Sequence, residues 1–321
     1  MAKDFIITVD LGGTKILSAL LDKKNNIVTR VKVATNIEQG ADGLVKDIVA
    51  SVKELLKKEN LKEDDLEAVS VGVPGTVNPK TGVIGIAPNL NIKNYNIKKS
   101  IMKKIPVPVL LENDVNLAGL GIKSFEFKDK VKNMLVVFVG TGIGGALFFD
   151  GKVYRGSSFY AGEIGHMLVC KDGSLAKDKG TEFEKLASRT AVVNGITEQI
   201  KNKKKSMLAE YVEKKKKIKS KAIAKAIAKK DKVAIEEVGI ACKIIGSVLG
   251  SITTLLNLDT IVLGGGLIEA NHGFMLPKIR AQFRKTVMKD VGKKTKIVVT
   301  KLGDDAPLYG GAALAKEFGG K

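Results

Sequence analysis

Residues 9–15 read VDLGGTK, an apolar strand that runs into an acid and a Gly-Gly turn. The strand delivers Asp10 to its end, and Gly12-Gly13 allows a tight turn with exposed backbone N–H groups. Such groups can cradle phosphate oxygens, while Thr14 and Lys15 add a hydroxyl and a positive charge. The stretch is neither a Walker P-loop nor a GxGxxG turn that opens a helix. A simple hairpin with a solvated lysine is the alternative interpretation.

Two further glycine clusters follow apolar strands later in the chain. Residues 139–145 read VGTGIGG with a hydroxyl at Thr141, and residues 262–267 read VLGGGL. One glycine turn after a strand is weak evidence, whereas three indicate repeated close approach of the backbone to a ligand. A nucleotide needs its phosphates and its adenosine held in separate places. The three clusters together therefore predict a nucleotide-binding protein.

A polar pentapeptide, ENDVN at residues 112–116, directly follows the apolar run PVPVLL. Phosphoryl transfer from ATP needs a base beside the acceptor hydroxyl, and an Asp at a strand end can be that base. Asn and Asp are also common helix N-caps. Asn113 and Asp114 are candidates for either task.

A second polar motif, AGEIGHM at residues 161–167, holds Glu163 and His166 three residues apart. In a helical segment this spacing places both side chains on one face. A carboxylate and an imidazole together can hold several sugar hydroxyls. His166 could equally be a structural residue or half of a metal site.

The order of apolar runs predicts an α/β fold. Three adjacent strands joined by tight turns are expected in the first 35 residues, followed by a helix over 41–58 and a strand that ends at Pro74-Gly75. The pattern restarts at Asn133 with another glycine-ended strand, and a last helix is expected from Pro307. Two units that open alike indicate an internal duplication, packed as two lobes with a cleft between them.

The formal charge of +20 comes almost entirely from lysine, because only five arginines are present. Proteins that recognise nucleic-acid bases, or that bind a phosphate through two hydrogen bonds from one side chain, tend to use Arg. The lysines are concentrated around residues 201–232. A solvated helical surface is the simplest interpretation, and a field that attracts anionic substrates is the alternative. No nucleic-acid partner is expected.

The cysteines and hydropathy indicate a cytoplasmic protein without a membrane partner. Cys170 and Cys242 are far apart and lack CxxC spacing, so neither a disulfide framework nor a cysteine-rich zinc site is expected. No uncharged apolar run reaches the roughly 18 residues needed to cross a bilayer. The N-terminus reads as a first strand and not as a signal peptide.

Taken in order, DLGGTK, PNL at 88–90, ENDVN, VGTGIGG, AGEIGHM, LGGGL and APLYGGAALA resemble the ROK family from residue 5 to about 315. That family comprises bacterial sugar kinases and sugar-responsive repressors. The resemblance implies a two-lobed actin-like/hexokinase (ribonuclease H-like) fold. Residues 1–115 with 305–321 would form the small lobe, and residues 116–304 the large lobe.

The resemblance also implies roles for individual residues. Asp114 looks like the general base that deprotonates the sugar hydroxyl, and Asp10 would help to position Mg²⁺. The residues implied for ATP and its phosphates are Asp10, Gly12, Gly13, Thr14, Lys15, Thr141, Gly142, Gly265 and Gly266, the last two beside the adenosine. Those implied for the sugar are Gly75, Asn89, Asn113, Asp114, Glu163, His166 and Glu184.

One departure from the family concerns zinc. Members usually carry CxCGxxGCxE after the GH motif, whereas Cys170 to Ser188 here reads CKDGSLAKDKGTEFEKLAS. Three cysteines at the family spacing do not exist, so Cys₃His coordination cannot form and no structural zinc is expected. Glu184 aligns with the family's sugar-binding Glu only through the closing stretch KLAS.

The resemblance favours an ATP:hexose phosphotransferase of glycolysis, with glucose converted to glucose 6-phosphate. AGEIGHM is closer to the glucokinase-like branch than to the ROK fructokinases. Kinases for N-acetylmannosamine, N-acetylglucosamine, allose or fructose are alternatives, as is a glucokinase that uses polyphosphate. A repressor would carry an additional N-terminal DNA-binding domain, for which a first strand near residue 4 leaves no room. An actin-like scaffold would not explain Glu163 and His166. The partners expected are a hexose, ATP and a second copy in a homodimer.

Overall fold

The computed structural model describes residues 4–170 and 180–319. The chain divides into two compact units. Unit 1 comprises Met1–Lys130, Val153–Ala161 and Asp304–Lys321, and unit 2 comprises Val131–Lys152 and Gly162–Gly303.

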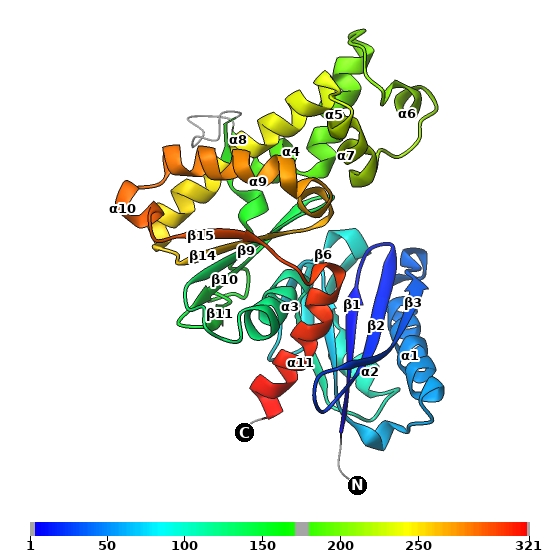
Figure 1. The fold of residues 1–321 in the computed structure, drawn as a ribbon. Coiled ribbons are helices and arrows are strands. Elements are labelled where there is room, and N and C mark those ends of the chain that lie inside the picture. The colour runs from blue at the N-terminus through cyan, green and yellow to red at the C-terminus, as the bar shows by residue number, and fades with distance from the viewer. Residues whose placement is uncertain (1–3, 171–179, 320–321) are drawn as a thin grey trace. The chain divides into compact units, whose positions relative to one another are not determined.

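A five-stranded sheet forms the centre of unit 1 (Figure 1). Its strands are β1 (Phe5–Leu11), β2 (Lys15–Asp22), β3 (Ile27–Ala34), β4 (Leu66–Val73) and β8 (Val109–Asn113). They lie in the order β3-β2-β1-β4-β8, with β1, β4 and β8 parallel and β2 antiparallel to both β1 and β3. The three N-terminal strands expected from the sequence are thus present, joined by tight turns.

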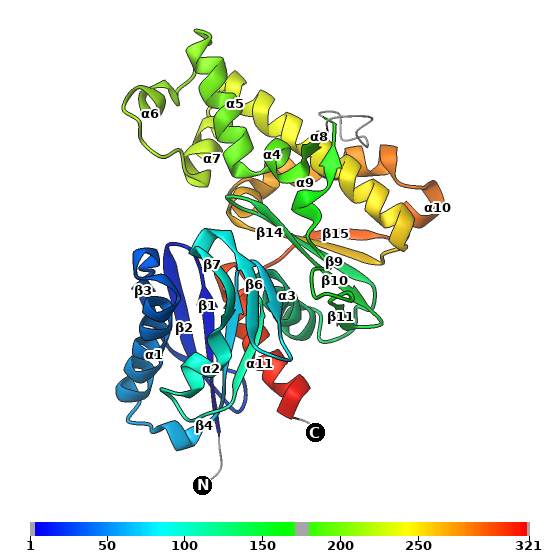
Figure 2. The ribbon, with the colours of Figure 1, turned by 180° about the vertical axis from the view of Figure 1, so that it is seen from behind.

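Helices cover both faces of this sheet. They are α1 (Gly40–Lys58), α2 (Ile97–Met102), α3 (Asp114–Gly121) and α11 (Ala306–Gly319), with short helical turns at η1 (Ile37–Gln39), η2 (Glu63–Asp65), η3 (Pro88–Leu90), η4 (Ile122–Glu126) and η6 (Gly303–Asp305). Figures 1 and 2 show α1 on one face and α3 with α11 on the other. Successive side chains of β2 point to opposite faces of the sheet and so contribute to two cores. Leu20 packs with α1, whereas Ala19 and Leu21 pack with α11.

A small antiparallel sheet is inserted between β4 and β8. It consists of β5 (Thr76–Asn78), β6 (Val83–Ala87) and β7 (Ile92–Asn96) in the order β5-β6-β7. Ile84, Ala87, Leu90 and Ile92 are buried in the same core as α1. This insertion therefore packs on unit 1 as part of its core.

A second five-stranded sheet, which belongs to unit 2 apart from Val153 and Tyr154, has the same strand order. Its strands are β9 (Met134–Val139), β10 (Ile143–Phe149), β11 (Lys152–Tyr154), β14 (Thr260–Gly264) and β15 (Lys296–Val299). They lie in the order β11-β10-β9-β14-β15, with β9 antiparallel to β10 and parallel to β14. The first three strands of each unit form one side of the sheet and the last two the other. The internal duplication expected from the sequence is confirmed.

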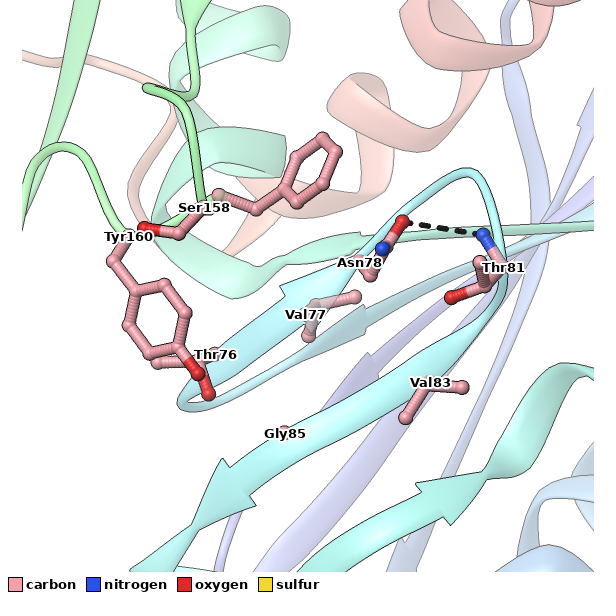
Figure 3. A pocket seen from close by; sticks show the side chains of 9 residues that line it. Thr76, Val77, Asn78, Thr81, Val83, Gly85, Ser158 and Tyr160 are labelled. Carbon is pink, nitrogen blue, oxygen red and sulfur yellow. Dashed lines mark hydrogen bonds between the residues drawn. The ribbon is translucent and has the colours of Figure 1, made fainter.

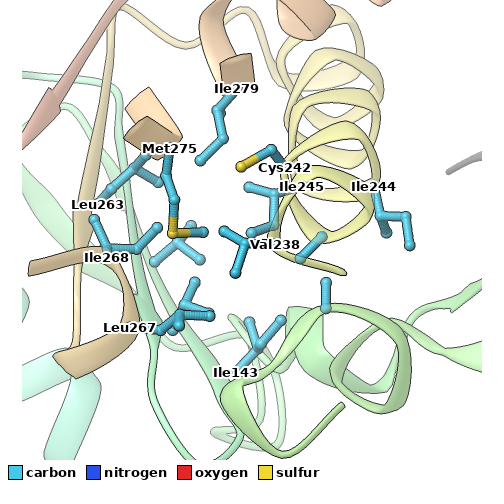
Figure 4. Packing of buried hydrophobic residues seen from close by; sticks show 14 of the residues in the cluster. Ile143, Val238, Cys242, Ile244, Ile245, Leu263, Leu267, Ile268, Met275 and Ile279 are labelled. Carbon is cyan, nitrogen blue, oxygen red and sulfur yellow. The ribbon is translucent and has the colours of Figure 1, made fainter. Parts of the chain in front are cut away.

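The helices of unit 2 pack around α8 and α9. They are α4 (Phe183–Ala187), α5 (Arg189–Lys201), α6 (Ala209–Glu213), α7 (Ser220–Ala228), α8 (Lys232–Leu256), α9 (Gly266–Thr286) and α10 (Lys289–Gly292), and the turn η5 (Ile164–His166) and the strand pair β12 (Leu168–Val169) and β13 (Thr181–Glu182) complete the unit. Figure 4 shows Cys242 and Ile245 of α8 facing Met275 and Ile279 of α9. Burial raises the pKa of the Cys242 thiol to about 12, so this cysteine is a core residue and not a reactive one.

Helix α8 is long and apolar enough to cross a membrane, with a mean hydropathy of 1.7 over its most apolar window. Within the described residues it is the one helix that meets this test. Lys243 divides the apolar residues of α8, so the segment does not contain the uncharged run of about 18 residues that the sequence analysis looked for. Since 67% of the window is buried inside the protein, the core of unit 2 accounts for its composition.

Glycines let α3 and α11 approach closely. A Cβ at Gly121 would lie 2.7 Å from the Gly310 nitrogen, and a Cβ at Gly310 would overlap the Leu117 carbonyl. We expect Gly310→Ala to lower the free energy of unfolding by about 1–3 kcal/mol, because neither backbone can move aside. The measurement is urea unfolding followed by circular dichroism.

Gly273→Ala in α9 is the matched control, since a Cβ there meets no atom within 4 Å. Removal of a glycine from an open helix position stabilises it by about 0.5–1 kcal/mol. If the two alanine variants were equally stable, close packing of α3 on α11 would be wrong.

Candidate active site

Parallel register aligns the carboxyl ends of three strands in unit 1. Asp10 of β1 lies opposite Gly72 of β4, and Gly72 lies opposite Glu112 of β8. The carboxyl ends of parallel strands are where open α/β sheets bind ligands. The sheet therefore brings Asp10 to the same edge as the segment that begins at Asn113.

The Gly12-Gly13 turn leaves β1 at this edge and contacts the PNL motif. The Gly12 N–H donates to the Lys15 carbonyl at 2.9 Å, and the Thr35 hydroxyl donates to the Gly12 carbonyl at 2.7 Å. A Cβ at Gly13 would lie 3.3 Å from the Asn89 carbonyl oxygen, so the two backbones are in contact there. Gly13 and Asn89, which are 76 positions apart in the sequence, are thus neighbours in unit 1.

The carboxyl group of Asp10 lies in an unfavourable environment for its charge. Burial, then the negative charge of Asp114, raises the pKa of Asp10 to about 7, with Asp304 adding to this and Lys15 opposing it. Lys15 in turn donates to Asp304 at 3.0 Å. Lys15 of the glycine turn and Asp114 therefore both lie close enough to Asp10 to interact with it electrostatically.

The raised pKa of Asp10 predicts a stability effect. The folded chain binds the proton more tightly than the unfolded chain, whose Asp pKa is about 3.9, so stability falls as pH rises from about 4 to 7. Asp10→Asn should raise Tm at pH 8 by at least about 2–4 °C without ligands, and the gain should shrink toward pH 4.

The exposed Asp64, changed to Asn, controls for loss of a surface charge. Thermal unfolding at several pH values compares the variants. An Asp10→Asn gain that is equal at pH 4 and pH 8 would contradict the raised pKa.

Asn113 and Asp114 begin α3. Asn113 is the N-cap, and its side-chain oxygen accepts from the N–H groups of Val115 at 2.9 Å and Asn116 at 3.0 Å. Asp114 is the first helical residue, and its carboxylate accepts from the Val115 N–H at 2.9 Å. Of the two candidates from the sequence, Asn113 is therefore the one that caps the helix.

The Asn113 amide also ties this segment to Gly75. Its Nδ2 donates to the Gly75 carbonyl at 2.9 Å. Gly75 has φ of +99°, and a Cβ there would lie 2.9 Å from Ala87 Cα. Only glycine fits this position, which brings Gly75 beside the start of α3.

A buried ion pair that the sequence analysis did not single out supports the same segment. Arg155 Nε donates to Glu112 at 2.7 Å, and Glu112 also accepts from the Asn113 N–H at 3.0 Å and from Asn116 Nδ2 at 3.1 Å. The Glu112 residue is 1% exposed. Arg155 is one of five arginines, but nothing in its local sequence indicates a partner 43 residues away.

The second glycine turn and Glu184 form one cluster in unit 2. Glu184 accepts from the Ile143 N–H at 2.8 Å, and a Cβ at Gly142 would overlap this carboxylate. Arg189, which begins α5, donates to the Thr141 hydroxyl at 2.6 Å. Arg189 was not among the residues expected here.

Glu163 is the N-cap of the turn η5 and His166 is its last residue, so their three-residue spacing brings them together. The His166 ring lies 4.0 Å from Glu163 and 3.2 Å from Glu182. Burial raises the pKa of Glu163; His166 opposes this and Glu184 adds to it. The three unit 2 residues expected for the sugar are therefore neighbours, with Glu182 as an unforeseen partner.

The third glycine turn lies beside the second. Gly264 of β14 is opposite Phe138 of β9, and a Cβ at Gly265 would lie 2.7 Å from the Val139 nitrogen. Gly265 has φ of +85° and precedes α9, which begins at Gly266. The carboxyl ends of β9 and β14 thus repeat the arrangement of β1 and β4 in unit 1.

The zinc expectation falls partly outside the described residues, because 171–179 belong to neither described range. Within 4–170 and 180–319, no group of three His, Cys, Asp or Glu side chains could hold a metal ion. We expect less than about 0.1 zinc per chain by elemental analysis of the purified protein, because the family's three-cysteine spacing is missing. Stoichiometric zinc that survives dialysis would contradict this prediction.

The sequence pattern that defines the ROK family matches residues 6–318. The chain belongs to the ROK family. It is 29% identical over 319 residues to a glucokinase of Halalkalibacterium halodurans, across 99% of this chain and 96% of that protein. It is also 29% identical over 310 residues to an N-acetyl-D-glucosamine kinase of Mannheimia succiniciproducens, across 95% and 97% of the two chains.

A ROK family glucokinase from Streptomyces griseus, solved in complex with glucose and AMPPNP, has a similar structure. The TM-score is 0.80 at 28% identity, and the match covers 98% of this chain and 99% of that one. Together with the repeated sheet order, this likeness confirms the expected α/β fold of the actin-like/hexokinase type.

Proposed function

We propose that this ROK protein is an ATP-dependent hexose kinase that converts glucose to glucose 6-phosphate. The observation that carries the proposal is the arrangement in unit 1: Asp114 begins α3 at the edge where β1 delivers Asp10 and the glycine turn. A carboxylate beside a phosphate-binding turn is what phosphoryl transfer to an alcohol requires. The glucokinase relatives support the same reaction.

In this proposal Asp114 is the general base. It takes the proton from the C6 hydroxyl as the sugar oxygen forms a bond to the γ-phosphorus, and the bond from that phosphorus to the bridging oxygen of ADP breaks. Asn113 cannot rotate freely, because it caps α3 and bonds to Gly75. The base therefore starts from a fixed backbone, which favours a reactive geometry.

The remaining sugar contacts are assigned by the hydrogen bonds that each side chain can make. The side chains of Asn89, Asn113, Glu163 and His166 offer the donors and acceptors that sugar hydroxyls need, and Gly75 allows close approach of the backbone. Glu184 fits less directly, because one of its oxygens accepts from Ile143. We infer that Glu184 positions the Thr141-Gly142 turn as well as any ligand.

The phosphates are assigned to the glycine turns. Gly12, Gly13, Thr14 and Lys15 in unit 1, and Thr141 and Gly142 in unit 2, are proposed to bind phosphate oxygens. Gly265 and Gly266 are proposed to lie beside the adenosine. Lys15 would exchange its bond with Asp304 for a phosphate, since both side chains are accessible to solvent.

The residues present fit Mg²⁺ delivered with the nucleotide. Mg²⁺ is usually held by one or two carboxylates together with substrate phosphates and water, so no preformed group of three acids is needed. Asp10 would supply such a carboxylate, and a bound cation would favour its charged form. When bound, Mg²⁺ neutralises the charge of the phosphate oxygens.

A hexose panel tests the proposal by coupled ADP release. Glucose should have the highest kcat/KM, and Asp114→Asn should lower kcat by about 10²–10⁴ because the base is lost. Asp64→Asn in the same unit is the control and should retain activity, since its side chain is exposed.

Two results would contradict the proposal. One is undiminished turnover by Asp114→Asn. The other is higher kcat/KM with N-acetylmannosamine, N-acetylglucosamine, allose or fructose, which would reassign the substrate while keeping the base.

A competition assay tests the phosphoryl donor. With ATP and polyphosphate at equal phosphoryl concentration, labelled ATP should supply nearly all the product, because the third glycine turn offers a place for adenosine. Preferential use of polyphosphate would instead indicate that the excess of lysines attracts the phosphoryl donor. Gly265→Val should raise KM for ATP and leave KM for glucose unchanged.

A further inference from the structure

Unit 1 contains a cavity of about 310 Å³ beside the small sheet. In Figure 3, Val77 and Asn78 of β5 and Val83 of β6 line one side, and Ser158 and Tyr160 approach from the loop that follows β11. None of these residues was expected to bind a ligand. The volume is within the range of small-molecule sites, which begins at about 300 Å³.

The lining carries no charge, and its exposed surface is more apolar than polar. Its polar side chains are Thr76, Asn78, Thr81, Ser158 and Tyr160. No lining residue carries a charge, although 27% of the chain does. A charged ligand would find no counter-ion among the lining side chains. A neutral ligand with several hydroxyls and an apolar face matches this lining.

Local constraints hold the cavity open. Asn78 accepts from the N–H groups of Lys80 at 3.0 Å and Thr81 at 3.2 Å, which fixes its amide in the turn (Figure 3). A Cβ at Gly85 would lie 2.8 Å from the Thr76 hydroxyl and 2.9 Å from the Tyr160 hydroxyl, so only glycine leaves this space.

The opposite wall is a strained loop. Phe159 has φ of +67°, a left-handed conformation that is unfavourable for a non-glycine residue. The loop is closed by the Ala161 N–H, which donates to the Arg155 carbonyl at 3.2 Å. Arg155 is anchored by Glu112, and this anchoring helps to maintain the strained conformation.

Both walls connect to Asn113. The β5 wall begins at Thr76, next to Gly75, whose carbonyl accepts from Asn113 Nδ2. The loop wall is joined through Arg155 to Glu112, which accepts from the Asn113 N–H. A ligand that shifts either wall therefore acts on the residue that caps α3.

From this geometry we propose that the cavity is a second carbohydrate site, which binds a neutral hexose and communicates with Asn113. Binding itself is independent of the proposed kinase function, whereas its effect on turnover rests on that function. The hydroxyls of Thr81, Ser158 and Tyr160 and the Asn78 Nδ2 group would bond to the sugar hydroxyls, and Val83 would contact the apolar face of the ring. The Thr76 hydroxyl already bonds to the Ile86 backbone, and Val77 lies in the core behind the lining.

Nuclear magnetic resonance with labelled valine methyl groups tests binding directly. D-glucose, D-mannose and N-acetyl-D-mannosamine are titrated without nucleotide, and glucose 6-phosphate serves as the charged counterpart. At least one neutral sugar should shift the Val77 and Val83 signals in a saturable manner, and glucose 6-phosphate should bind at least about tenfold more weakly. Sugar at the proposed catalytic site also moves the Asn113 amide signal, so the informative part is the shift that Thr81→Val and Tyr160→Phe weaken. That part should follow the same dissociation constant as the Val83 shift.

Thr81→Val and Tyr160→Phe should each weaken binding about fivefold to tenfold, because each removes one hydroxyl group. Thr29→Val on β3 is the matched control and should bind as the wild type does. Asp114→Asn should keep the Val77 and Val83 shifts, which separates this site from the proposed catalytic one.

The proposal is overturned if no neutral sugar shifts these signals at about 100 mM, well above the roughly millimolar Kd of a weak site. It is also overturned if Thr81→Val and Tyr160→Phe bind like the wild type, or if glucose 6-phosphate binds equally well. Failure of the hexose panel with intact Val77 and Val83 shifts would refute the kinase assignment alone.

Discussion

The carboxylate of Glu112 is the constraint on which the candidate site of unit 1 depends. It is almost fully buried and accepts from Arg155, from Asn116 and from the Asn113 backbone. Burial of an ion pair costs desolvation energy, which the hydrogen bonds to its carboxylate offset in part. Here the three donors fix the last residue of β8 and the first turn of α3. This network therefore holds the backbone at which Asp114 begins α3.

The repeated sheet explains why the candidate site residues of each unit lie near the ends of strands. In unit 1 the parallel strands deliver Asp10, Gly72 and Glu112 to one edge, and in unit 2 they deliver Val139 and Gly264. Glycine follows the strand at β1, β9 and β14, where the chain turns sharply and the backbone stays accessible. The side chains beside these turns differ between the units, with Asp114 in unit 1 and Glu163 in unit 2.

The sequence predicted the fold class, the duplication and most element positions, because strand-to-glycine transitions and helical periodicity are local signals. Helix α1 begins within a residue of the expected range, and η3 coincides with PNL. Local signals could not reveal the contacts of Arg155 with Glu112, of Arg189 with Thr141 or of His166 with Glu182, since each joins residues brought together by folding. The cavity beside β5 was missed for the same reason. Its lining consists of ordinary turn residues whose chemistry is visible only when two segments meet.

The most direct test of the account is a crystal structure of this chain with glucose and a non-hydrolysable ATP analogue. The account predicts an Asp114 carboxylate oxygen about 2.6–3.2 Å from the C6 hydroxyl, with the γ-phosphate on the opposite side of that oxygen in line for transfer. The Gly12-Gly13 turn should contact phosphate oxygens. An Asp114 side chain directed away from the sugar, with another carboxylate in its place, would contradict the central claim.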